Sequence, residues 1–258
     1  MTLRDSLAIC VPYLPDAFCF LASCVIFLGY QYFIKRKSLN NPMETVQGIS
    51  SLARAVWVRS VMEEDRDILT VQTLRNSTMA ATFMASTAIL LTVGVLTLSG
   101  QSDKLKITWH VLEFFGDRHE SLLPVKLIII LLDLFSSFFL FASSIRLYND
   151  VGYMINARYR QRQQAISPKI VGTRMASAQL NRAGDHYRMG MRGFYSMLPL
   201  VFWIFSPLFL LIATIIVVII LYHLDRTYTV EKNFDQERIA MYCSIDGNCR
   251  LPEQNEKE

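Results

Sequence analysis

The sequence predicts an all-α integral membrane protein: a four-helix bundle that crosses the lipid bilayer, with additional amphipathic or cytosolic helices in its first and third loops. Hydrophobic residues make up 52% of the 258 residues, and they gather in four long blocks. Each block has roughly 18 or more residues, enough for a helix to cross a hydrocarbon core of about 30 Å. Buried helices of soluble proteins have shorter apolar runs and polar faces, so a soluble fold is disfavoured.

The predicted spans divide the chain into a membrane domain over residues 1–227 and a polar tail over residues 228–258. The four spans are expected at approximately residues 14–34, 77–98, 123–147 and 198–222. The fourth span contains Pro207, which removes one helical hydrogen bond and is expected to kink the helix.

Small residues predict how the second span packs. Ala81, Ala85, Ala88 and Thr92 fall on one face of the predicted helix. Small side chains allow the backbones of neighbouring helices to approach closely in lipid. We therefore expect the second span to be a central packing helix.

The two large loops also contain helical patterns. In the first loop, apolar residues recur at helical spacing from Thr45 to about Ser60. This helix can lie in the headgroup region or pack against its neighbours in the cytosol, and the sequence leaves both interpretations open. In the third loop, a helix is expected from Arg174 to about Tyr195, after the break at Ser167 and Pro168.

The charge distribution predicts the orientation. Lys and Arg in short loops beside the spans mark the cytoplasmic side. The first and third loops hold seven and nine such residues, so both loops are expected in the cytoplasm and both termini on the non-cytoplasmic side. In a bacterium the location would be the inner membrane. The net charge of +4 favours an anionic lipid surface as the binding partner. Nucleic acid is a less suitable partner, because the sequence has no motif that reads nucleic acid.

The oxidation state of two cysteines in the tail depends on that orientation. Cys243 and Cys249 bracket a turn-like segment and can close a small disulfide loop if the tail lies in an oxidising compartment. Two unrelated free thiols are the alternative.

One acidic residue lies well inside a predicted span. Asp133 belongs to a polar stripe on this predicted helix, and the stripe continues through Ser136, Ser137 and Ser144. Intramembrane acids are expensive and often mark ion or proton pathways. The stripe is therefore either a conduction path facing the second span or a protonated, hydrogen-bonded Asp that fixes the helix register.

No catalytic constellation supports an enzyme. The sequence has no phosphate-binding Gly-rich loop, no Gly-x-Ser-x-Gly and no His-Glu-x-x-His motif. We expect no cofactor and no resident metal. A metal site on the outer face from His110, His119 and His223, with Glu113 or Asp117, is a minor alternative. The expected partners are the lipid bilayer and other membrane subunits or further copies of the chain.

Four segments resemble a known family. They are residues 71–80 (VQTLRNSTMA), 144–149 (SIRLYN), 193–195 (GFY) and 198–207 (LPLVFWIFSP). Together they are similar to the membrane-protein family called domain of unknown function 599, over roughly residues 15–227. The resemblance implies a multi-helix membrane protein and supplies no activity.

The same segments place polar residues at two span ends that are expected on one side of the membrane. Arg75 and Asn76 begin the second span, whereas Arg146 and Asn149 end the third. The arginines can reach phosphates or the free carbonyls of a helix end. The residues that would complete a polar clamp or a small polar pocket are Gln72, Arg75, Asn76, Arg146, Tyr148 and Asn149.

These observations favour a non-enzymatic membrane protein that acts as a scaffold or an accessory subunit. One alternative is an oligomeric channel or carrier that uses the Asp133–serine stripe. Another is a metal or redox protein of the outer face.

Overall fold

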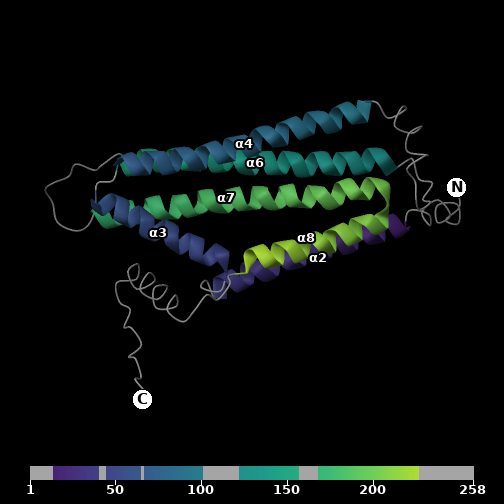
Figure 1. Cartoon of the computed structure of the whole chain (residues 1–258), viewed down its shortest axis with the longest axis horizontal. Coiled ribbons are helices and arrows are strands. Elements are labelled where there is room, and N and C mark those ends of the chain that lie inside the picture. Colours follow the sequence, from purple (N-terminus) through teal and green to yellow (C-terminus); the bar gives the residue numbers. More distant parts are fainter. Residues whose placement is uncertain (1–13, 41–44, 65–66, 101–121, 157–167, 227–258) are drawn as a thin grey trace, which may run out of the picture. The chain divides into compact units, whose positions relative to one another are not determined.

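The computed structural model describes residues 14–40, 45–64, 67–100, 122–156 and 168–226. These residues form six helices and no strand: α2 (Leu14–Asn40), α3 (Val46–Glu64), α4 (Asp67–Gly100), α6 (Leu123–Asn156), α7 (Pro168–Phe205) and α8 (Pro207–Asp225) (Figure 1). The predicted all-α class is confirmed. An isolated antiparallel bridge joins Thr45 to Arg226.

Four of the described helices are long and apolar enough to cross a membrane. Their candidate spans are Pro15–Asn40, Ile68–Gly100, Leu123–Ile155 and Pro207–Asp225. The first three expected spans lie within α2, α4 and α6, and each helix continues beyond the expected span at its polar end. Proline stands at the first or second position of α2, α6, α7 and α8, where its missing N–H costs no helical bond.

The fourth expected span, residues 198–222, is divided at Ser206. The Ser206 N–H donates to the Phe202 carbonyl at 3.4 Å, and the Ser206 carbonyl accepts from the Leu210 N–H at 3.3 Å. The Ser206 hydroxyl accepts from the Leu208 N–H at 3.4 Å. Ser206 therefore ends α7 and caps α8, with Pro207 at the first helical position.

The expected kink at Pro207 is thus a helix boundary. The chain reverses its direction there, so that α8 runs back from the end of α7 (Figure 1). A proline next to a serine is a helix-start signal, and the sequence interpretation missed it because the apolar pattern continues through the break.

The described helices contribute to two compact units. Unit 1 consists of residues 1–33, 80–143 and 186–223, and unit 2 consists of residues 34–79, 144–185 and 224–258. The apolar parts of α2, α4, α6 and α8 belong to unit 1, together with the second half of α7. The charged parts of the long helices belong to unit 2.

Unit 1 contains the expected packing face of the second span. Ala81 and Ala88 are fully buried, and Ala85 and Thr92 are nearly so. The expectation that this face packs against other helices is confirmed. A separate cluster in unit 1 joins Val95 of α4 to the buried Ile130 and Leu134 of α6.

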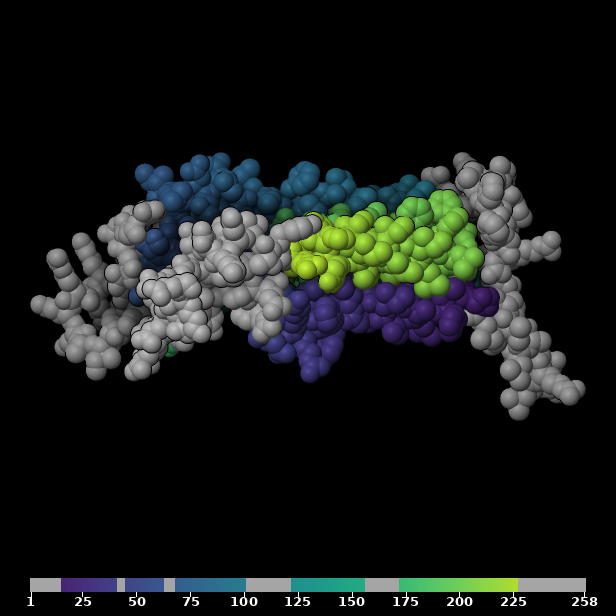
Figure 2. All heavy atoms as spheres, turned by 60° about the horizontal axis from the view of Figure 1, so that its bottom comes forward, coloured from purple at the N-terminus to yellow at the C-terminus, as the bar shows by residue number. Residues whose placement is uncertain are grey.

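Helix α8 lies beside α2 in unit 1 (Figure 2). The buried hydroxyls of Ser23 and Thr214 share a hydrogen bond of 2.5 Å. Thr214 donates to the Leu210 carbonyl of its own helix at 2.7 Å, so Ser23 is the donor to Thr214. A hydroxyl pair of this kind holds two helices together where lipid offers no alternative partner.

Unit 2 has a hydrophobic core of its own. It is built from α3, the first part of α4, the last part of α6 and the first part of α7. Its buried members are Val58, Val61, Leu74, Leu147, Tyr148, Val151, Ile155, Ala176, Leu180 and Ala183. Thr45 precedes α3 and caps it, because its hydroxyl accepts from the Gly48 N–H at 3.2 Å. Because α3 contributes Val58 and Val61 to this core, the interpretation of a packed helix is favoured over one lying free in the headgroup region.

Candidate functional site

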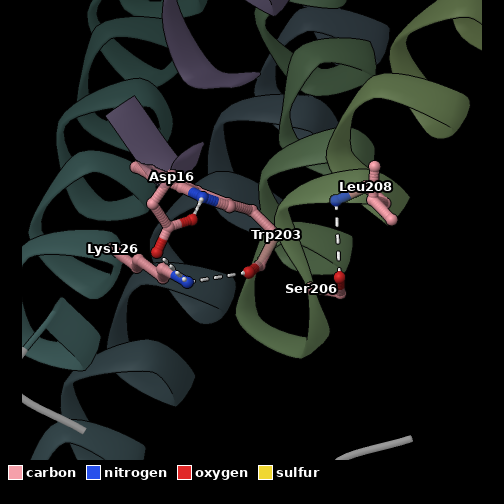
Figure 3. Close-up of polar contacts among 5 residues, drawn as sticks. All are labelled: Asp16, Lys126, Trp203, Ser206 and Leu208. Atoms are coloured by element: carbon pink, nitrogen blue, oxygen red, sulfur yellow. Dashed lines mark hydrogen bonds and ion pairs between the residues drawn. The ribbon is translucent and has the colours of Figure 1, made fainter. Parts of the chain in front are cut away.

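The clearest polar site of unit 1 joins the first turns of α2 and α6 to the end of α7 (Figure 3). The Asp16 carboxylate receives a hydrogen bond from the Trp203 indole N–H at 2.8 Å. Its other oxygen forms an ion pair with the Lys126 ammonium group at 3.2 Å. Asp16 is 4% exposed and Lys126 is 9% exposed, so the pair is shielded from solvent.

Backbone chemistry explains why Lys126 has a second partner. In a continuous helix, the Trp203 carbonyl would accept from the N–H of residue 207, which proline lacks. Lys126 donates to this carbonyl at 3.2 Å. Its ammonium group also lies 5.3 Å from the centre of the Trp203 ring, within the range of a cation–π interaction. Phe20 stacks on the same ring with the centroids 4.6 Å apart.

This arrangement satisfies both carboxylate oxygens and neutralises the charge of Asp16. A buried pair with such partners fixes geometry, because removal of either member leaves an uncompensated charge. We conclude that the Asp16–Lys126–Trp203 site holds three helix ends together.

A second polar site lies in the interior of unit 1, between α6 and α7. The Ser196 hydroxyl lies 2.9 Å from Asp133 Oδ1 and 2.7 Å from the Gly193 carbonyl. Two buried atoms beside this contact, Asp133 Oδ2 and Ser137 Oγ, have no hydrogen-bond partner among the described residues. Asp133 is therefore bonded to α7, whereas the conduction path, one of the two interpretations from the sequence, was expected to face the second span.

Glycine allows α7 to approach this site closely. A Cβ atom at Gly193 would overlap with Ser137 Oγ and would lie 3.9 Å from Asp133 Oδ1. One turn earlier, a Cβ atom at Gly190 would lie 2.8 Å from the Phe141 ring. Only the absence of a side chain at these two positions permits the observed contact between α6 and α7.

The predicted serine stripe is only partly assembled. Ser137 is buried at the second site, but Ser136 is exposed. Ser144 belongs to unit 2, where its hydroxyl donates to the Ala183 carbonyl at 2.9 Å. The stripe expected on α6 is thus divided between a polar cluster in unit 1 and a helix–helix hydrogen bond in unit 2.

The clamp residues predicted from the resembling segments lie in unit 2. Gln72, Arg75 and Asn76 are exposed on α4, and Arg146 and Asn149 are exposed on α6. Tyr148 is buried in the core of the unit. The clamp or pocket stays a prediction.

A different polar contact joins two helices of unit 2. Arg54 Nε on α3 donates to Asn181 Oδ1 on α7 at 2.9 Å. The guanidinium group covers Gly184, where a Cβ atom would lie 2.8 Å from Arg54 Cζ. The planar guanidinium thus packs against backbone while it bonds to the amide.

Several residues of these sites were missed in the sequence. They are Asp16, Gln31, Arg54, Lys126, Asn181, Arg192, Ser196 and Trp203. One available signal was Lys126, a lysine placed in the first turn of an apolar helix, which requires a counter-ion. The partners come from distant helices, as for the bond from Arg192 to Gln31, so sequence spacing could not reveal them.

Other predicted residues lie outside the described part of the chain. These are Cys243 and Cys249 of the tail, and His110, His119, Glu113 and Asp117 of the second loop. Among the described residues, no group of three or more His, Cys, Asp or Glu side chains is arranged to hold a metal ion.

The fold and the paired polar groups define a multi-pass, helical membrane protein. Residues 18–230 match the family model described as "Protein of unknown function, DUF599". The chain belongs to this family, and the resemblance inferred from its four segments is confirmed. No curated protein and no solved structure matches the chain.

Proposed function

We propose that this protein is a non-enzymatic scaffold or accessory subunit of a membrane assembly. The observation that carries this proposal is the separate hydrophobic core of unit 2. Helices α4, α6 and α7 have 34, 34 and 38 residues, whereas about 20 suffice to cross the bilayer. The additional turns build a folded unit that the membrane crossing itself does not need.

The surface of unit 2 supports binding to an acidic partner. Its exposed side chains include five arginines, namely Arg59, Arg75, Arg146, Arg174 and Arg182. Arginine forms bidentate bonds with carboxylates and phosphates. A rigid helical unit with exposed arginines is suited to hold an acidic segment of a neighbouring membrane protein at the bilayer surface.

The orientation proposed here keeps the basic loops in the cytoplasm and the N-terminus on the opposite side. For the C-terminus, three observations support the cytoplasmic side instead of the side expected from loop charges. The chain reverses at Ser206, α8 lies beside α2 through Ser23 and Thr214, and Arg226 pairs with Thr45 at the start of α3. In this proposal the second half of α7 is a fifth crossing, with Trp203 buried and with Leu198 and Phe202 about half exposed.

Native mass spectrometry of the protein, purified gently from its own membranes, tests the proposed function. We expect a partner subunit in fixed stoichiometry with the wild-type chain. The double substitution Arg75→Glu and Arg146→Glu should release this partner subunit. The control Gln72→Ala, a neutral change on the same exposed face of α4, should retain it. Helix content measured by circular dichroism should be unchanged in both variants. A wild-type chain that carries no partner protein would contradict the proposal.

A channel or carrier is the second candidate, and the contact between Asp133 and Ser196 at 2.9 Å in unit 1 favours it. Asp133→Asn would then abolish ion or solute flux in proteoliposomes. Equal flux in the wild type and this variant would contradict the channel or carrier, and the scaffold proposal would stand as the single candidate.

A further inference from the structure

We propose that Lys35, Arg36 and Arg226 form a binding site for the phosphate headgroup of an anionic phospholipid, near the ends of α2 and α8. The three residues belong to unit 2, and the ligand is a lipid of the surrounding bilayer. This inference goes beyond the scaffold proposal and does not depend on it. It starts from a hydrogen bond that fixes the register of two parallel helices.

Helices α2 and α8 run side by side in the same direction (Figure 1). The hydroxyls of Ser23 and Thr214 join them at 2.5 Å. Lys35 lies 12 residues after Ser23, and Arg226 lies 12 residues after Thr214. Because an α-helix rises about 1.5 Å per residue, each basic residue lies about 18 Å from the bonded pair along its helix. Lys35 and Arg226 are therefore at the same level.

The distance from the first turns of α2 and α8 to these basic residues matches the thickness of a bilayer. Asp16 lies 19 residues before Lys35, and Pro207 lies 19 residues before Arg226. These residues span about 28 Å, whereas the hydrocarbon core is about 30 Å thick. In α2, no charged residue lies between Asp16 and Lys35. The two basic residues are therefore placed at the level of the lipid headgroups.

Exposed tyrosines indicate the same level independently. Tyr32 of α2 is 67% exposed, and Tyr222 of α8 is 42% exposed. They lie three and four residues before Lys35 and Arg226, about one helical turn nearer to the bilayer centre. Tyrosine is enriched at the boundary between the hydrocarbon core and the headgroups. The order of tyrosines and basic residues on both helices is thus typical of a membrane surface.

The basic side chains are accessible to an anion. Lys35, Arg36 and Arg226 are exposed, and no ion pair joins any of them to a described residue. Asp225, the acid next to Arg226, is only partly exposed and has interactions of its own. Ammonium and guanidinium groups bind phosphate through charge-assisted hydrogen bonds. An anionic headgroup therefore supplies a counter-charge that none of the described residues provides.

Apolar surface on the membrane side of the basic residues favours a lipid over a soluble anion. Val25 and Leu28 of α2 are exposed, as are Ile216 and Ile220 of α8. Acyl chains can pack against these side chains while the phosphate contacts the basic groups. A soluble phosphate would use the basic groups alone. The site therefore fits a molecule with an anionic head and apolar chains.

Titration of the purified full-length protein with phosphatidylglycerol or phosphatidylcholine in detergent, followed by native mass spectrometry, tests this proposal. We expect phosphatidylglycerol to bind more tightly. The triple variant Lys35→Gln, Arg36→Gln and Arg226→Gln should bind phosphatidylglycerol about one hundredfold more weakly, because each basic residue near an anionic surface contributes about fivefold. The control Lys35→Arg, Arg36→Lys and Arg226→Lys retains the charges and should keep most of the affinity.

Equal affinities of the wild type for the two lipids would overturn the proposal, as would unchanged phosphatidylglycerol binding in the glutamine variant. Displacement of phosphatidylglycerol by glycerol 3-phosphate would assign the basic residues to a soluble anion instead. If the glutamine variant fails to fold, the salt dependence of the wild type decides the matter. Phosphatidylglycerol binding should weaken in high salt, and binding that is insensitive to salt would contradict the site.

Discussion

The Lys126 ammonium group donates a hydrogen bond to the Trp203 carbonyl oxygen at 3.2 Å. This oxygen is the one that Pro207 leaves without its helical partner. Asp16 balances the added charge at 3.2 Å. The boundary between α7 and α8 and the buried ion pair are therefore parts of one arrangement, in which a side chain of α6 supplies a bond that the backbone of α8 lacks.

The ion pair should stabilise unit 1 cooperatively. Removal of one partner of a buried pair costs roughly 3–5 kcal/mol, because the other charge is left uncompensated. Asp16→Ala and Lys126→Met should each lower the free energy of unfolding in detergent by about this amount. The double variant should lose less than the sum of the two. Asp150→Ala, a partly exposed position of α6, serves as the control, and strictly additive losses would contradict the pairing.

The boundary at Ser206 should depend on its hydroxyl. Loss of a serine cap typically costs about 1 kcal/mol, so Ser206→Ala should reduce the unfolding free energy by that amount. Ser206→Thr retains an oxygen acceptor and should keep most of the stability. Ser136→Ala removes an exposed hydroxyl outside the cap and should have little effect. Equal stability of Ser206→Ala and the wild type would disprove the capping role.

The approach of α7 to α6 should not tolerate a methyl group at Gly190. A Cβ atom there would lie 2.8–3.0 Å from three atoms of the Phe141 ring, and this ring is fully buried. Overpacking of this kind costs typically 1–3 kcal/mol, which thermal unfolding of Gly190→Ala will measure. Phe141→Leu should partly restore stability in that background.

The matched control for this prediction is Gly94→Ala. No atom lies within 4 Å of a Cβ at Gly94, and alanine is the better helix former. We therefore expect no loss of stability. A similar loss in both variants would show that the effect is intrinsic to the helix and unrelated to Phe141.

The proposed orientation predicts where a cysteine of the tail reacts. With Cys243 as the only cysteine, a membrane-impermeant maleimide should label the protein only after the cells are opened. A single cysteine introduced as Arg36→Cys, at the cytoplasmic end of α2, should behave in the same way. Labelling of Cys243 in intact cells would instead restore the orientation derived from loop charges alone. It would also return the disulfide between Cys243 and Cys249 to consideration.

Individual residues show how far the sequence could predict this structure. The buried face of α4, with Ala81 and Ala88, followed from periodicity, because small residues at helical spacing favour close packing of helices in lipid. The division at Ser206 did not, since the hydropathy of residues 198–222 is continuous across it. The partners of Asp133 and Asp16 could not be predicted from the sequence either. Each partner lies on another helix, more than 60 positions away along the chain.

The sequence by itself determined the class of protein, its family and the apolar segments that enter the membrane. These properties depend on composition and on contacts within single helices, which are local along the chain. Only the tertiary structure decided which polar groups meet, where the last helix reverses and which atoms remain without a partner. Such outcomes depend on the pairing of helices that are distant in sequence, and hydropathy and helical periodicity do not encode that pairing.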